Sequence, residues 1–262
     1  MNYRTFKGVT GVSVTVMVAF IIAVIAVIGS KTSPDALIAN LTSEEILFAI
    51  RLSLITATIS SIMCMVVAIP SGYALARLDF PGRTFADTVV NLPLALPPLV
   101  AGVGLLLFFG QTPIGNALES VGFKFVFTPA GVVMAQFLIN VPFAIRIMRS
   151  TFDGINPRYE HVAKTLGYTH SGAFWKVSLP MAKNGLLAST AITWAKGMGE
   201  FGAVLMLAGA TRMKTETLPI AVFLNMSSGD LQLAIAAAII LIGVSFFALF
   251  VLERFGGEAK IY

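Results

Sequence analysis

The sequence has little charge. Of its 262 residues, 12% are charged, while 56% are hydrophobic. A soluble domain carries about 25% charged residues, so most of the surface of this chain is expected to face lipid instead of water. We therefore predict an integral membrane protein. A nucleic-acid-binding function is excluded, because it needs a basic soluble surface and the chain has no soluble domain to carry one.

Several chemical groups are also scarce or missing. Cys64 is the single cysteine, which rules out an internal disulfide and leaves packing as its expected role. No phosphate-binding loop of the form G-x-x-x-x-G-K-[ST] occurs, so the chain cannot hydrolyse ATP by that route. His161 and His170 have no cysteine or carboxylate partners at ligand spacing, so no metal site is expected. No nucleophile and base are recognisable together on the polar segments, and the chain is predicted to be non-catalytic.

Long apolar runs are what the sequence does have. Each is close to the roughly 20 residues that a helix needs to cross a bilayer. The runs are continuous and do not alternate, which favours helices over barrel strands. The predicted spans are 8–30, 50–76, 88–110, 126–146, 184–209 and 231–252. We thus predict an all-α membrane domain over residues 1–262 with six transmembrane helices. The first run resembles a signal peptide, but its length and the lack of a clear cleavage site favour a retained helix.

Lysine and arginine are distributed unevenly between the two sides of these spans. One side carries Arg4, Lys7, Arg77, Arg83, Arg146, Arg149, Arg158, Lys164, Lys176, Lys183, Arg254 and Lys260. The other carries Lys31, Lys124, Arg212 and Lys214, with Arg51 at a span edge. Because basic residues concentrate on the cytoplasmic side, both termini and the loop 147–183 are predicted to be cytoplasmic. The protein is expected in the plasma or inner membrane, in contact with anionic lipid.

The loop 147–183 is predicted to contain a short, well-delimited helix. Asn156 is a suitable N-cap, Pro157 suits the first helical position, and Gly167 suits a left-handed residue at the end. An apolar stripe with helical spacing joins Tyr159, Val162, Ala163 and Leu166, and Arg158, Glu160, His161 and Lys164 occupy the rest. Such a helix either docks into a groove of a partner or lies on the membrane surface.

The spacing beyond this helix carries a resemblance. Ala163, Gly167, Val177, Leu179 and Pro180 follow the pattern A, three residues, G, nine residues, I-x-L-P. This is similar to the signature loop of the membrane subunits of ATP-binding-cassette importers, which implies a type I importer permease fold. The family's glutamate falls at His161 and its first alanine at Val162, with Glu160 displaced by about 100° round the helix. The apolar residues Val162, Ala163 and Leu166 are therefore the expected contact.

Two further motifs narrow the resemblance. Asn91-Leu-Pro-Leu-Ala-Leu-Pro-Pro-Leu-Val100 and Gly199-Glu-Phe-Gly-Ala203 resemble spans of the molybdate, tungstate and sulfate permeases. The segment Leu205-Met-Leu-Ala-Gly209 favours a molybdate or tungstate permease, with a sulfate permease as the alternative.

The resemblance implies a division of labour. Two copies of this chain would form the path, two separate ATPase subunits would grip the loop helices, and an external binding protein would deliver the oxyanion. ATP and Mg²⁺ would be held by the ATPase, and no cofactor by this chain. The signature loop residues Leu179 and Pro180, which lead directly into the fifth span, would transmit the movement.

Charge and proline inside the spans point to candidate path residues. Lys196 and Glu200 are spaced i, i+4 on one predicted face, where they either line the path or form an internal ion pair. Pro97 and Pro98 remove backbone donors and are expected to bend the third span, beside a cavity or as a packing kink. Gly197, Gly199 and Gly202 match a dinucleotide-binding pattern, but without a preceding strand we interpret them as close helix contacts, and Gly199 as part of the path.

Two other classes of transporter remain as alternatives. A secondary transporter driven by an ion gradient usually has more spans, internal repeats and several intramembrane carboxylates, whereas Glu200 is the single carboxylate within a predicted span here. A passive channel would show polar rings. An importer permease should copurify with an ATPase, and neither of these should.

Overall fold

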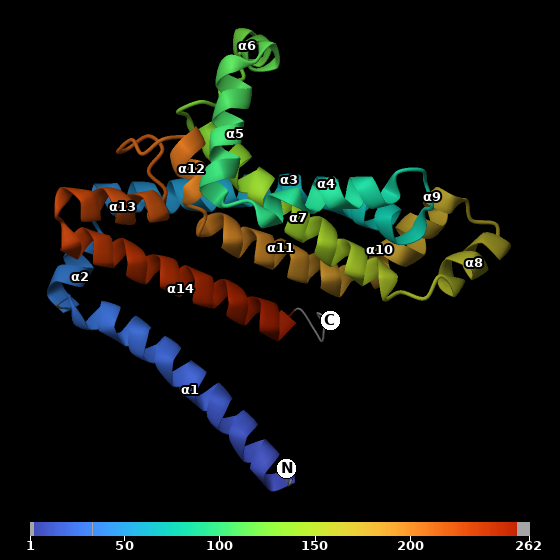
Figure 1. Cartoon of the computed structure of the whole chain (residues 1–262), viewed down its shortest axis with the longest axis horizontal. Coiled ribbons are helices and arrows are strands. Elements are labelled where there is room, and N and C mark those ends of the chain that lie inside the picture. The colour runs from blue at the N-terminus through green and yellow to red at the C-terminus, as the bar shows by residue number, and fades with distance from the viewer. Residues whose placement is uncertain (1–2, 33, 256–262) are drawn as a thin grey trace.

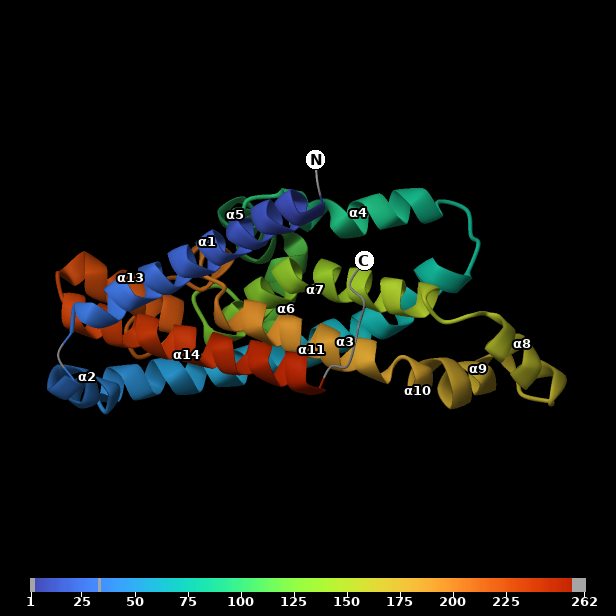
Figure 2. The same cartoon turned by 90° about the horizontal axis from the view of Figure 1, so that it is seen from below.

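The protein is helical throughout the residues that the structure describes, 3–32 and 34–255, and no strand occurs among them; the structure is a computed structural model. Lys260, which counts toward the charge asymmetry, lies outside these residues. Four helices run side by side along the long axis of the molecule (Figures 1 and 2): α3 (Glu44–Arg77), α7 (Pro129–Asp153), α11 (Lys183–Met198) and α14 (Leu231–Phe255). They form the body on which the other elements are placed.

The closest pairing in this body is between α3 and α7. The hydroxyl of Ser43 accepts a hydrogen bond from the Ile46 amide and starts α3, with Glu44 at the positive end of the helix dipole. Farther along, a Cβ on Gly72 would come within 2.8 Å of the Arg149 amide, so the glycine lets the two backbones approach. Cys64 is buried in the same contact, and its predicted packing role is confirmed.

The third predicted span is sharply bent. It consists of α4 (Arg83–Ala95) and α5 (Pro98–Gln111), and the chain bends by 111° between the two helices. Pro97 and Pro98 cannot donate backbone hydrogen bonds across the break, which explains why the helix stops there. The predicted kink is confirmed, and it is large enough to turn α5 and α6 (Pro113–Ser120) out of the bundle (Figure 1).

The fifth predicted span is also broken. It consists of α11 and the short α12 (Gly202–Leu207), and the backbone between them is not helical. Glu200 accepts a hydrogen bond at 3.0 Å from the Ala203 amide, which replaces a backbone acceptor at the start of α12. The chain then passes through α13 (Leu218–Ser228) before α14.

These breaks change the number of continuous spans. In the described part of the chain, four helices are long and apolar enough to cross a membrane, or five if α4 and α5 count as one span. The prediction of six spans counted 88–110 and 184–209 as continuous helices. In the structure each of these ranges is divided into two helices, and a hydropathy pattern cannot reveal such breaks in the backbone.

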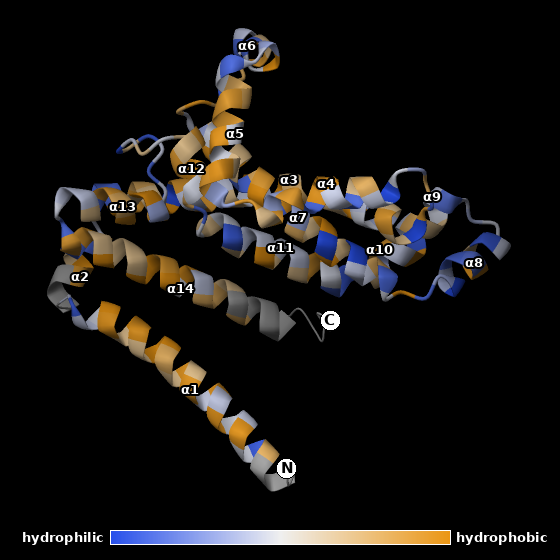
Figure 3. Cartoon of the chain, in the orientation of Figure 1, coloured by the Kyte–Doolittle hydropathy of each residue, from blue (hydrophilic) through white to orange (hydrophobic). Residues whose placement is uncertain are grey.

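The first helix stands apart from the bundle. α1 (Tyr3–Ser30) leads through α2 (Pro34–Leu41) into α3, and no residue of its apolar stretch from Phe6 to Ser30 is buried. Figure 3 shows apolar residues along α1 and α5, and polar residues gathered at the opposite end on α8 (Arg158–Thr165) and α9 (His170–Ala173). That polar end is the predicted cytoplasmic loop.

Candidate coupling surface and translocation path

The loop helix α8 has a defined beginning and end. The side chain of Asn156 accepts a hydrogen bond at 3.0 Å from the Arg158 amide. At the other end Gly167 has φ +92°, and the Tyr168 amide donates to the Ala163 carbonyl at 3.1 Å. This is the pattern of a helix closed by a left-handed glycine. The predicted caps are therefore in place, with α8 beginning at Arg158.

Glu160 ties α8 to the transmembrane body. Its carboxylate accepts hydrogen bonds from the Ser178 hydroxyl at 2.7 Å, the Tyr73 hydroxyl at 2.9 Å and Nε of Arg77 at 3.1 Å. Only 4% of the residue is exposed. Tyr73 and Arg77 belong to α3, and Ser178 lies beyond α8 in the chain, so one carboxylate joins three segments.

The environment of Glu160 favours its charged form. Burial raises the pKa of this carboxyl, but the hydrogen bonds from Ser178, Tyr73 and Arg77 and the charge of Arg77 outweigh burial and lower it below 4.5. Because the folded pKa lies below the unfolded one, the stabilisation is present above about pH 4.5 and is lost as the pH falls through the lowered pKa. The link is intact at neutral pH.

The apolar stripe of α8 is divided between two faces. Ala163 is buried with Glu160 on the side facing the protein, whereas Tyr159, Val162 and Leu166 are exposed, Leu166 to 74%. The contact with a partner was expected to involve Val162, Ala163 and Leu166. Ala163 has to be removed from this set, because other parts of the same chain bury it. His161 is exposed as well.

Two aromatic residues extend the exposed surface and were missed by the helical periodicity. Tyr168 and Trp175 are both exposed on the same polar end of the molecule. They lie outside α8, so a search for one amphipathic helix could not find them. Aromatic side chains within a basic loop were the available signal, since such residues are enriched at protein interfaces.

The segment after α8 returns to the membrane without a flexible linker. Phe174–Ser178 forms a π-helix, Leu179–Met181 a short α-helix, and α11 begins at Lys183. Leu179 is half-buried and Pro180 is exposed. Pro180 has no amide proton for a regular helical bond, which fits the widened turn before it.

Lys196 and Glu200 do not form the ion pair that their spacing allows. The ammonium group of Lys196 lies 4.1 Å from the centre of the Phe143 ring. The carboxylate of Glu200 instead accepts a hydrogen bond from the Ala203 amide. The reason is the end of α11 at Met198, which removes the helical relation between the two positions. Lys196 is exposed on the surface of the subunit, while Glu200 is buried.

The breaks in the third and fifth spans lie against each other. A Cβ added to Gly202 would lie 3.1 Å from Cβ of Pro98, and one added to Gly102 would lie 2.8 Å from Cα of Ala203. Two of the three motif glycines make close interhelical contacts, Gly197 with Ala57 and Gly202 with α5. Pro97 and Gly199 are exposed beside these contacts. The structure thus brings the predicted path residues into one region, apart from the polar end.

The sequence is similar to a family of membrane transport proteins and to individual permeases. Residues 68–256 match the family model for the binding-protein-dependent transport system inner membrane component. A probable molybdenum ABC transporter permease of Haloferax volcanii is 33% identical, and the match covers 97% of this chain and 91% of the relative. A sulfate transport system permease of Escherichia coli is also 33% identical, over 82% of this chain and 80% of the relative.

Solved structures agree at the level of the fold. A chain of a bacterial alginate ABC transporter, in complex with a pentasaccharide-bound periplasmic protein, superposes with a TM-score of 0.73 at 15% identity, over 97% of this chain and 96% of that one. The model match covers well over half of the chain, and the two curated relatives exceed 30% identity over most of it. The chain is therefore a multi-pass membrane protein that belongs to the family of binding-protein-dependent transport system inner membrane components, the permease subunits of ABC transporters.

Proposed function

We propose that the chain is the permease of an ATP-driven importer for a tetrahedral oxyanion, with molybdate or tungstate as the favoured substrate and sulfate as the alternative. The two sequence motifs around Pro97 and Glu200 support this, as do relatives named for molybdenum and for sulfate. Two copies of the chain would enclose the path, with both termini in the cytoplasm and six spans each if α4–α5 and α11–α12 each cross the membrane as one broken span.

The observation that carries the proposal is the anchoring of α8 by Glu160. A helix held by three hydrogen bonds at its inner face, and presenting Tyr159, Val162 and Leu166 outward, can transmit a push from a partner to α3 without bending. The partner would be a separate ATPase subunit that binds ATP and Mg²⁺, because this chain has no phosphate-binding loop.

Alternating access follows from this arrangement. Closure of two ATPases on ATP would bring the two copies of α8 together, and the link through Arg77 would turn α3 with them. The permease would open outward to receive the oxyanion from an external binding protein. Release of ADP and phosphate would restore the inward-facing form.

The test is ATPase stimulation in a reconstituted complex. Binding protein loaded with molybdate, tungstate or sulfate is added in turn, and the oxyanion that raises hydrolysis and is taken up identifies the substrate. Leu166→Asp should abolish retention of the ATPase during purification. Phe123→Asp, at an exposed apolar residue outside α8, should retain it. Equal retention in both variants, or uptake driven by an ion gradient without ATPase, would contradict the proposal.

A further inference from the structure

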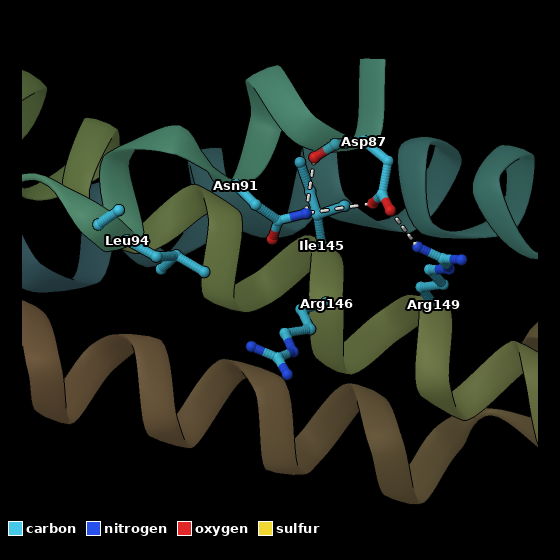
Figure 4. A pocket seen from close by; sticks show the side chains of 7 residues that line it. Asp87, Asn91, Leu94, Ile145, Arg146 and Arg149 are labelled. Carbon is cyan, nitrogen blue, oxygen red and sulfur yellow. Dashed lines mark hydrogen bonds and ion pairs between the residues drawn. The ribbon is translucent and has the colours of Figure 1, made fainter. Parts of the chain in front are cut away.

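A cavity of about 500 Å³ opens between α4 and α7. Its lining is Asp87, Asn91, Leu94 and Ala95 from α4, and Ile145, Arg146 and Arg149 from α7 (Figure 4). Arg149 is one helical turn from Asp153, the last residue of α7, after which the chain enters the loop that carries α8. The cavity therefore belongs to the end of the bundle that is predicted to face the cytoplasm.

The two arginines in this cavity differ in their partners. Arg149 donates to Asp87 at 2.8 Å and lies 3.7 Å from Asp153. Arg146 lies one turn earlier on α7 and has no hydrogen bond or ion pair within the described residues. Figure 4 shows Arg149 turned to Asp87 and Arg146 pointing away from this pair. Arg146 is thus the uncompensated cation of the cavity.

Asp87 has a second hydrogen-bond partner besides Arg149, and its ion pair with Arg149 is partly open to water. One of its oxygens accepts from Nδ2 of Asn91 at 3.1 Å, and the other from Arg149. Both side chains of the ion pair are about one-third exposed, at 32% each. An ion pair that is partly open to water is weak, so a second anion that enters the cavity can compete with Asp87 for the guanidinium.

We propose that this cavity binds a tetrahedral oxyanion through Arg146 and Arg149, with Asp87 as an internal competitor that keeps the binding weak. The inference rests on the proposed function, because it makes the cavity an exit site for the transported ion. Arg146 and Arg149 are at i, i+3 on α7, so their long side chains can turn from the directions seen in Figure 4 toward one ion, and each guanidinium then supplies a planar pair of donors that matches oxyanion geometry. The volume equals about 17 water molecules at roughly 30 Å³ each, so the ion would keep part of its hydration shell.

The position explains why weak binding is useful. A site near the exit has to attract the doubly charged ion from the path and then release it. When the ion leaves, Asp87 can pair with Arg149 again, which lowers the free-energy cost of release. Since α7 continues into the loop of α8, movement of α8 would also shift Arg146 and Arg149 against Asp87, which is on α4.

The first experiment measures binding to the full chain in neutral detergent, with labelled molybdate and with sulfate as competitor. Arg146→Gln should weaken binding about tenfold, because a charge-assisted donor is lost. Asp87→Asn should strengthen binding roughly threefold to fivefold, because the competitor is neutralised. Arg158→Gln, which removes a positive charge outside the cavity, is the control and should leave the affinity unchanged. Thermal unfolding of each variant checks that it is folded.

The same chemistry could come from the phosphate of an anionic lipid. Binding is therefore repeated in bilayers of phosphatidylcholine alone and with phosphatidylglycerol added. If the free oxyanion fails to bind in neutral lipid, or if affinity is unaltered in both Arg146→Gln and Asp87→Asn, the exit site is refuted. Phosphatidylglycerol that binds in an Arg146-dependent manner, with no such dependence for molybdate, would assign the cavity to lipid and also refute it.

Uptake by the reconstituted complex separates this inference from the proposed function. Both Arg146→Gln and Asp87→Asn should slow uptake, the first by weaker capture and the second by slower release. Normal uptake in both variants would overturn the exit site while leaving the importer intact. If the unmodified complex takes up no oxyanion, the proposed function itself fails.

Discussion

The carboxylate of Glu160 in α8 is paired with Nε of Arg77 in α3 at 3.1 Å, across 83 positions of sequence. Both side chains are largely shielded from water, with 5% and 11% exposed. Removing one partner of such a pair leaves the other charge buried without compensation. The pair therefore decides whether α8 moves as part of the transmembrane body or separately from it.

Glu160→Ala is expected to loosen α8 from α3. The three lost hydrogen bonds include one from a charged group, and such bonds contribute about 1.5–3 kcal/mol. Hydrogen exchange should show lower protection of the amides of α8, while α3 and α7 stay protected. His161→Ala, at the exposed neighbouring position, is the control. Equal loss of protection in both variants would show that Glu160 does not hold the helix.

The end of α8 depends on the backbone conformation of Gly167. With φ +92° and no atom within 4 Å of an added Cβ, a substitution is strained by its backbone alone. That strain is about 1–2 kcal/mol for an ordinary L-residue and less for asparagine. We expect Gly167→Val to uncouple ATP hydrolysis from uptake more than Gly167→Asn does. Gly154→Ala, in the right-handed region of the same loop, should have no effect. Indistinguishable coupling in the valine and asparagine variants would contradict this.

The crossing of α5 and α12 requires a glycine at position 102. A Cβ there would lie 2.8 Å from both Cα of Ala203 and Cβ of Met206, whereas one on Gly104 would meet nothing within 4 Å. Gly102→Ala should therefore lower stability by about 1–3 kcal/mol through overpacking. Gly104→Ala should be neutral or stabilising, since alanine has the higher helix propensity. Thermal unfolding in detergent measures both, and the inverse order of Tm values would show that the two helices are not in contact.

Glu216, in the segment between α12 and α13, makes stability depend on pH. Burial raises its pKa to about 7, with a contribution from nearby Glu45, although the Met213 amide and Arg212 act in the opposite direction. A carboxyl with a raised folded pKa contributes stability below its unfolded value of about 4.5 and loses it as the pH rises through about 7. Glu216→Gln cannot ionise, so its Tm should rise relative to the parent between those two pH values. A constant difference would exclude this titration.

The helical body could be predicted from the sequence because one physical requirement dominates it. Continuous apolar runs form helices in a membrane, and the predicted spans locate α1, α3, α7 and α14, with ends that differ from those of the structure by up to seven residues. The caps of α8 were predictable for a similar reason, since Asn156 and Gly167 act through local backbone geometry. Both are properties of neighbouring residues in the chain.

The features that could not be predicted depend on distant parts of the chain. The inward direction of Glu160 results from Tyr73 and Arg77 on another helix, and a helical wheel cannot show it. The break after Met198 depends in part on the contact of Gly202 with α5, and it separates Lys196 from Glu200, so the ion pair, one of the two alternatives for these residues, does not form. Counting basic residues assigns Arg146 to one side of the spans, but it cannot show that this residue lines a cavity with residues of α4.

Lys196 tests whether an exposed charge in the fifth span serves transport. Its contact with Phe143 stabilises the fold by a cation–π interaction of about 0.5–2 kcal/mol, and its charge can attract an anion, so two variants separate these effects. Lys196→Met removes both and should reduce oxyanion uptake by tenfold or more, and Lys196→Arg should restore much of the loss because the charge remains. Phe143→Leu keeps the charge and should lower Tm with uptake retained. Undiminished uptake in Lys196→Met would show that the lysine only packs against its neighbour, because a residue that attracts the anion electrostatically cannot lose its charge without slowing transport.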